Sequence, residues 1–129
     1  MRVPRTVKKL GRMKRPISPM MHGVLDYATV AATAAVPRLM GFPKQATMAA
    51  DALAGGYGML SSVTDYPLSA KRVVPFKGHG LAEAAVGLAL PFLPWALGFA
   101  DNRAARNFFL GLTAVTFVVA AMTDWDADE

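Results

Sequence analysis

Four stretches of this chain, each 17–19 residues long, carry almost no charged side chains. They are residues 22–40, 46–64, 81–99 and 107–123. A helix rises about 1.5 Å per residue, so each stretch would be about 26–28 Å long as a helix. That length is close to the ~30 Å hydrocarbon core of a bilayer. The spacing of the charges therefore favours four membrane-crossing helices.

A soluble four-helix bundle is the competing interpretation of these stretches. Such a bundle needs a charged stripe along the outer face of every helix, and the stretches lack one. Charged residues make up 18% of the 129 residues, and hydrophobic residues 53%. The chain has no cysteine, which excludes a disulfide scaffold, a Cys-ligated metal and a thiol nucleophile. We therefore predict an all-α integral membrane protein.

The first and third stretches align with each other at a spacing of 57 residues. Across the 22 pairs from His22/His79 to Pro43/Ala100, seven pairs are identical. Composition alone would give about two identities in such an alanine-rich chain. The second and fourth stretches end in related triplets: Thr64-Asp65-Tyr66 and Thr123-Asp124-Trp125. The sequence thus predicts a helical hairpin that is used twice.

Two tandem hairpins have the same orientation, because each returns the chain to its starting side. A pseudo-two-fold axis along the membrane normal would then relate them. The predicted fold is a four-helix membrane bundle made of two helical-hairpin repeats. Its parts are a basic N-terminal tail (1–21), a first transmembrane hairpin (22–65), a linker (66–78), a second transmembrane hairpin (79–124) and an acidic C-terminal tail (125–129).

The distribution of cations predicts the orientation in the membrane. The N-terminal tail and the linker carry ten Lys and Arg residues, and the two hairpin loops carry four. Positive charge stays on the cytoplasmic side, so we expect both termini there. The tail suits contact with anionic lipid headgroups of the bilayer. It lacks the interleaved aromatic residues that would stack on bases, so we expect no nucleic-acid partner.

Several of these motifs together resemble a known group of proteins. They are His22-Gly23, Asp26, Thr64-Asp65-Tyr66-Pro67, His79-Gly80, Glu83, Pro94-Trp95 and Thr123-Asp124-Trp125. Over residues 17–126 the chain resembles small bacterial four-helix membrane proteins of the SPW-repeat type. Of the Ser-Pro-Trp triplet itself, this chain has Pro94-Trp95, preceded by leucine. The resemblance implies four helices in a bacterial inner membrane and no particular activity.

Ionisable residues gather at the predicted cytoplasmic end of the helices. His22 and Asp26 are four residues apart, as are His79 and Glu83, so each pair shares one helix face. The predicted polar network consists of His22, Asp26, Thr64, Asp65, His79, Glu83, Thr123 and Asp124. The leading interpretation is structural: each imidazole bonds an acid or a threonine on a neighbouring helix. Such bonds would lock the hairpins together in lipid, where no hydrophobic force does so.

Three alternatives assign chemistry to the same residues. Two histidines and four carboxylates match the ligands of a divalent-metal bundle, although such bundles place Glu and His three residues apart rather than four. The metal ligands would be His22, Asp26, Asp65, His79, Glu83 and Asp124. The two histidines could instead be the axial ligands of haem b, or the cluster could relay protons or ions. The leading interpretation requires no cofactor.

Small residues in the second stretch predict a helix-packing face. They are Ala52, Ala54, Gly55, Gly56 and Gly58. Asp51, nearby, is expected to pair with Arg38, Lys44 or a partner chain. No nucleophile–base pair, phosphate loop or dinucleotide fingerprint is present. We therefore predict a non-catalytic accessory or scaffold subunit, attached to a protein partner or to a second copy of itself.

Overall fold

The computed structural model describes residues 15–127, and every named element in this range is helical. The elements are α2 (Pro19–Leu39), α3 (Lys44–Ser62), α4 (Phe76–Ala89), the 3-10 turn η1 (Leu90–Phe92), α5 (Leu93–Ala96) and α6 (Arg103–Met122). The expectations for the basic tail fall mostly on residues 1–14, which lie outside the described residues, as do residues 128–129.

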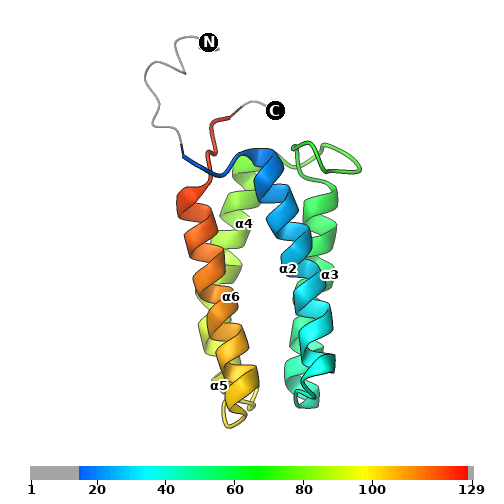
Figure 1. Cartoon of the computed structure of the whole chain (residues 1–129), viewed down its shortest axis with the longest axis vertical. Helices are drawn as coiled ribbons and strands as arrows, with labels where there is room; N and C mark the ends of the chain where they lie inside the picture. Colours follow the sequence, from blue (N-terminus) through cyan, green and yellow to red (C-terminus); the bar gives the residue numbers. More distant parts are fainter. Residues whose placement is uncertain (1–14, 128–129) are drawn as a thin grey trace.

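The four long helices form two antiparallel hairpins, α2 with α3 and α4 with α6 (Figure 1). Both ends of the described chain lie at one end of the molecule, together with the α3–α4 connection (Figure 1). We call this the terminal end, and we call the opposite end, where each hairpin turns, the loop end. The all-helical prediction is confirmed for the described residues.

Local sequence explains where the helices begin and turn. The Ser18 hydroxyl accepts a hydrogen bond from the Met21 N–H, and the Asn102 side chain accepts one from the Ala105 N–H. Both are side-chain caps that satisfy free N–H groups at a helix start. At the loop end, Gly41 and Gly98 have φ values of 63° and 75°, a region that glycine adopts without steric strain.

The third apolar stretch is not the single continuous helix that the sequence predicts. Helix α4 ends at Ala89, and η1 and α5 carry the chain on to the loop. Pro91 and Pro94 lie in this segment. Each lacks an N–H and crowds the carbonyl four residues before it, so the regular helix gives way to a 3-10 turn.

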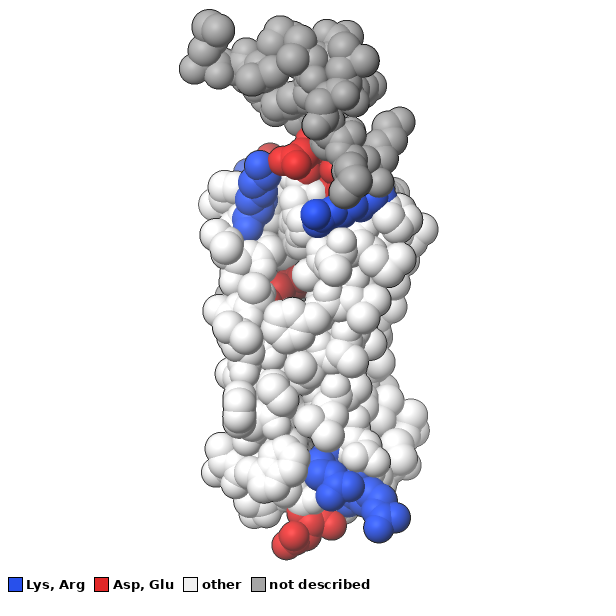
Figure 2. Space-filling model, turned by 90° about the vertical axis from the view of Figure 1, so that its left-hand side faces the viewer, with Lys and Arg blue, Asp and Glu red and all other residues white. Residues whose placement is uncertain are grey.

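The long sides of the molecule expose large apolar side chains. Leu39, Met59 and Leu81 are 83%, 75% and 74% exposed. Figure 2 shows charged side chains gathered at the two ends of one face, with one recessed acidic patch in the uncharged band between them. Among the described helices, α6 is the one long and apolar enough to cross a membrane, and only 11% of its most apolar segment is buried.

An apolar core joins the hairpins at the loop end. Phe42 of the α2–α3 turn packs against Phe108 of α6, with ring centroids 5.6 Å apart. The core consists of Phe42, Ala46, Ala50, Leu90, Phe99, Ala105 and Phe109. At the terminal end the hairpins meet through polar side chains instead, and these form the candidate site.

Candidate functional site

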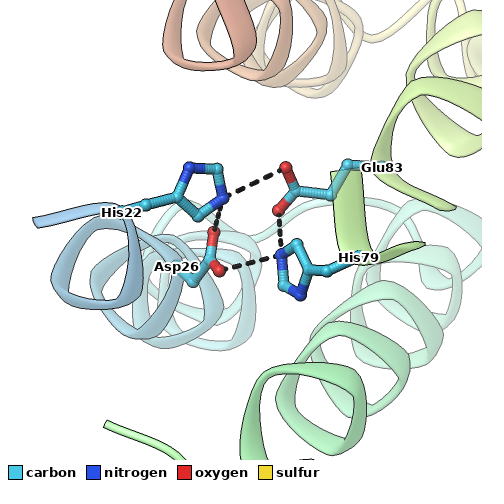
Figure 3. A group of neighbouring side chains, drawn as sticks. All are labelled: His22, Asp26, His79 and Glu83. Atoms are coloured by element: carbon cyan, nitrogen blue, oxygen red, sulfur yellow. Dashed lines mark hydrogen bonds and ion pairs between the residues drawn. The ribbon is translucent and has the colours of Figure 1, made fainter. Parts of the chain in front are cut away.

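Four ionisable side chains converge between the hairpins (Figure 3). Helix α2 supplies His22 and Asp26, and α4 supplies His79 and Glu83. The Nε2 atom of His22 lies 3.3 Å from Asp26 Oδ1 and 3.3 Å from Glu83 Oε2. The Nε2 atom of His79 lies 3.0 Å from Asp26 Oδ2 and 2.8 Å from Glu83 Oε1. Each carboxylate therefore bridges both imidazoles, and we call these four residues the quartet.

A threonine holds the outer nitrogen of each imidazole. His22 Nδ1 lies 2.9 Å from Thr123 Oγ1, and His79 Nδ1 lies 2.7 Å from Thr64 Oγ1. Each threonine hydroxyl already donates its proton to a backbone carbonyl of its own helix, 2.6 Å away. A hydroxyl has one proton to donate, so it must accept from the imidazole. Both histidines thus carry a proton on Nδ1 and direct Nε2 toward the carboxylates.

Aromatic side chains cover the quartet on the side of the terminal end. The His22 ring lies 5.3 Å from the ring of Phe76 and 5.0 Å from that of Trp125. The Tyr66 hydroxyl donates a hydrogen bond to Asp26 Oδ2 over 3.2 Å. Burial raises the pKa of Tyr66 above its ordinary value, so this donor keeps its proton. His22 and His79 are completely buried as a result.

The glycine after each histidine makes room for one of these aromatic residues. A Cβ atom on Gly80 would lie 2.8 Å from the Trp125 ring, and one on Gly23 would lie 3.3 Å from the Tyr66 ring. Trp125 is held in turn by its indole N–H, which donates to the Ala120 carbonyl. The covering role of Phe76, Tyr66 and Trp125 was not predicted from the sequence. The repeated His-Gly and Thr-Asp-aromatic motifs were the available signal.

A cavity of about 40 Å³ adjoins the quartet on the side of the loop end. Asp26 and Glu83 both line it, together with Tyr57, whose hydroxyl is buried without a hydrogen-bond partner in the described chain. The rest of the lining consists of Leu25, Thr29, Val30, Thr33, Ala54, Val115, Thr116 and Val119. The quartet is therefore covered by aromatic rings on one side and faces a small cavity on the other.

Two carboxylates expected in the network are not part of the quartet. Asp65 is exposed and forms an ion pair with Arg72 at 3.3 Å. Asp124 pairs its backbone N–H with the Ile17 carbonyl, and its Oδ1 accepts from the Asp126 N–H. Both residues follow a threonine that points inward just beyond a helix end; Asp65 is exposed, whereas Asp124 is buried. Including Asp65 in the polar network was therefore wrong, and neither aspartate belongs to the group of possible metal ligands among the described residues.

The predicted packing face on α3 packs only in part within the described residues. Ala54 is buried, and a Cβ atom on Gly58 would lie 3.7 Å from Val30. Ala52, Gly55 and Gly56 are exposed instead. Asp51, expected to pair near the loop end, binds Arg38 through two hydrogen bonds of 2.7 and 2.8 Å.

The arrangement does not favour haem. The two imidazole rings have centroids 5.4 Å apart and lie at 82° to each other, with the carboxylates beside them. A macrocycle with both histidines as axial ligands would have to displace Asp26 and Glu83 from these positions.

Comparison of the chain with family models, curated proteins and solved structures finds no match.

Proposed function

We propose that this chain is a small integral membrane protein that acts as a non-catalytic accessory or scaffold subunit. In this proposal the quartet is a clamp that fixes the two hairpins to each other. The observation that carries it is that His22 contacts Glu83 and His79 contacts Asp26, each at 3.3 Å or less across the hairpin boundary. Polar contacts of this kind can hold helices together in lipid.

The membrane location is supported by the outer surface. Large apolar side chains are exposed along the helices, and charges gather at the two ends (Figure 2). A soluble protein rarely exposes so continuous an apolar surface. The tail and the linker at the terminal end carry ten cations against four in the hairpin loops, so we propose that the terminal end lies on the cytoplasmic side.

The duplication is supported by equivalent contacts in the two hairpins. Ile17 pairs with Thr123 in one isolated parallel bridge, and Val74 pairs with Thr64 in the other. Ile17 and Val74 are 57 positions apart, the spacing at which the two histidines align. Each threonine also binds the histidine of the other hairpin. These matched contacts are those expected of a hairpin that was copied and then paired with itself.

The accessory role is supported by a face of α3 that nothing in residues 15–127 covers. Ala52, Gly55 and Gly56 are exposed, and a Cβ atom on either glycine would meet no other atom within 4 Å. Small residues allow the backbone of another membrane helix to approach closely. We propose that a helix of a partner subunit, or of a second copy of this chain, occupies this face.

Cysteine labelling tests the membrane topology directly, because the chain has no cysteine of its own. Ser69→Cys places a thiol in the α3–α4 connection, and Asp101→Cys places one in the α5–α6 turn. In intact cells, a membrane-impermeant maleimide should label Cys at position 101 and not at position 69. Recovery of the protein in the soluble fraction, or labelling of both positions from outside, would contradict the proposal.

Purification in mild detergent tests the accessory role. We expect the protein to elute with a stoichiometric partner or as an oligomer. Gly56→Leu, which fills the exposed face of α3, should then shift the elution toward the monomer. Leu39→Ala, at an exposed position on α2, serves as the control and should not. A monomer under all conditions would contradict the accessory role.

A further inference from the structure

We propose that the quartet binds one divalent transition-metal ion, of the zinc, manganese or iron(II) class, between the two hairpins. The ligands would be the Nε2 atoms of His22 and His79 and one carboxylate oxygen each from Asp26 and Glu83. This inference goes beyond the clamp and does not depend on the membrane location. A bound ion would strengthen the same connection between α2 and α4.

The four side chains lie close enough together to surround one ion. One ligand atom from each residue can be chosen so that all four lie within 4.8 Å of one another. The four nitrogen–oxygen distances are 3.3, 3.3, 3.0 and 2.8 Å. Bonds of about 2.0–2.1 Å to a tetrahedral zinc ion place neighbouring ligand atoms about 3.3–3.4 Å apart. Each carboxylate turns one oxygen to His22 and the other to His79, so an ion would require both carboxylates to rotate and the four chosen atoms to draw together from a spread of up to 4.8 Å.

The threonines set the tautomer that metal binding needs. A metal-bound imidazole usually donates its other N–H to an oxygen, which fixes the ring and the tautomer. Here the Nδ1–H groups of His22 and His79 donate to Thr123 and Thr64. Each threonine is fixed in turn by its bond to a helix carbonyl. With an ion bound and both imidazoles neutral, both Nε2 lone pairs would point into the quartet; without an ion, His79 Nε2 must carry a proton to hydrogen-bond Glu83 Oε1 at 2.8 Å.

The environment of His22 Nε2 points to a missing ligand. It is completely buried, yet it makes no hydrogen bond in the described part of the chain. Its contacts with two carboxylate oxygens, each 3.3 Å away, are ion pairs only when the imidazole is protonated; in a neutral imidazole with its proton on Nδ1, Nε2 has no proton to donate to them. Buried polar atoms normally have a partner, because an unpartnered one is destabilising. A metal ion would use this nitrogen.

The charges also match. Asp26 and Glu83 bring two negative charges into a buried site, where unpaired charge is strongly unfavourable. With neutral imidazoles, one divalent cation balances them. Imidazole and carboxylate ligands suit zinc, iron and manganese, whereas copper(I) prefers the thiolates that this chain lacks. The adjoining cavity, which both carboxylates line, could admit a water molecule as a further ligand near Tyr57.

Metal titration of the purified full-length protein tests this proposal. The protein is produced without a polyhistidine tag, stripped with a chelator and titrated with cobalt(II) and zinc(II) in detergent. We expect one ion per chain, with cobalt(II) giving the intense visible bands of a tetrahedral site. Glu83→Gln keeps the size of the side chain and removes a ligand charge, and should weaken binding at least about 10-fold. Asp51→Asn removes an exposed carboxylate and should leave binding unchanged.

A second variant tests the threonine that positions a ligand. Thr123→Val removes the acceptor for His22 Nδ1 without touching a ligand atom, and should weaken metal binding by about 10–100-fold. Failure of the folded protein to bind cobalt(II) or zinc(II), or equal binding by Glu83→Gln, would overturn the metal site. The clamp would still stand if His22→Ala lowered the melting temperature in the presence of chelator.

Discussion

At the scale of single residues, the threonine protons decide how the site is built. Thr64 and Thr123 each donate to their own helix, so each must accept from a histidine of the other hairpin. Because the threonine hydroxyl gives its proton to a helix carbonyl, its oxygen accepts from the Nδ1–H group of the imidazole. The Nε2 atom of the imidazole therefore faces the carboxylates. The threonines are positioning residues for the quartet.

Removing one threonine hydroxyl should therefore destabilise the protein. Thr123→Val leaves the buried Nδ1–H of His22 without an acceptor, and we expect a loss of about 1 kcal/mol in the free energy of unfolding. Thermal unfolding in detergent measures the effect. Thr113→Val is the matched control, because Thr113 donates in the same way to a carbonyl of its own helix and has no histidine partner. Equal losses in the two variants would argue against the positioning role.

The residue scale also shows what the sequence could not predict. Four-residue spacing placed His22 beside Asp26 and His79 beside Glu83, because helix geometry fixes that neighbourhood. Asp65 and Asp124 lie beyond the last helical turn, where no such periodicity applies. Their side-chain directions depend on the bridges to residues 74 and 17, and the sequence alone does not reveal these contacts.

At the scale of elements, charge spacing located the four long helices but not the break in the third stretch. Three stretches without internal interruption correspond to α2, α3 and α6. The third contains Pro91 and Pro94, which have no backbone N–H and therefore interrupt the helix. A hydropathy pattern does not show this interruption, because it measures only how apolar the side chains are. Pro37, which is also a helix-ending signal, lies inside the last turn of α2, so the helix ends two residues after this proline and not before it.

The docking of the C-terminal segment on α4 gives a second prediction. Gly80→Ala would place a Cβ atom 2.8 Å from the Trp125 ring, and we expect a loss of about 1–3 kcal/mol from overpacking. Gly55→Ala is the control, because its Cβ atom would meet nothing within 4 Å. That substitution should stabilise α3 by about 0.5–1 kcal/mol. Thermal unfolding compares the two, and a neutral Gly80→Ala would contradict the described packing.

At the scale of the whole molecule, the two hairpins are joined at both ends by different means. The loop end has an apolar core around Phe109, which is fully buried. The terminal end has the quartet. The cavity lies between helices of both hairpins, with lining residues from α2, α3, α4 and α6. The hairpins should therefore remain associated when one of the two joints is weakened.

This two-ended attachment predicts additive effects. Phe109→Ala should reduce the free energy of unfolding by about 3–5 kcal/mol through the loss of buried volume. His22→Ala should reduce it by about 1 kcal/mol. Because the two sites share no contact partner, the double variant should lose the sum to within about 0.5 kcal/mol. Strong coupling between the two would show that the ends are not independent joints.

The central claim is that residues from different hairpins form one quartet, and a double-mutant cycle on His22 and Glu83 tests it most directly. Unfolding of His22→Ala, Glu83→Ala and the double variant is measured in the same detergent, with chelator present. We predict a coupling energy of about 0.5–3 kcal/mol for this pair and none for His22 with Asp51, an exposed carboxylate paired with Arg38. Zero coupling between His22 and Glu83 in folded variants would contradict the account.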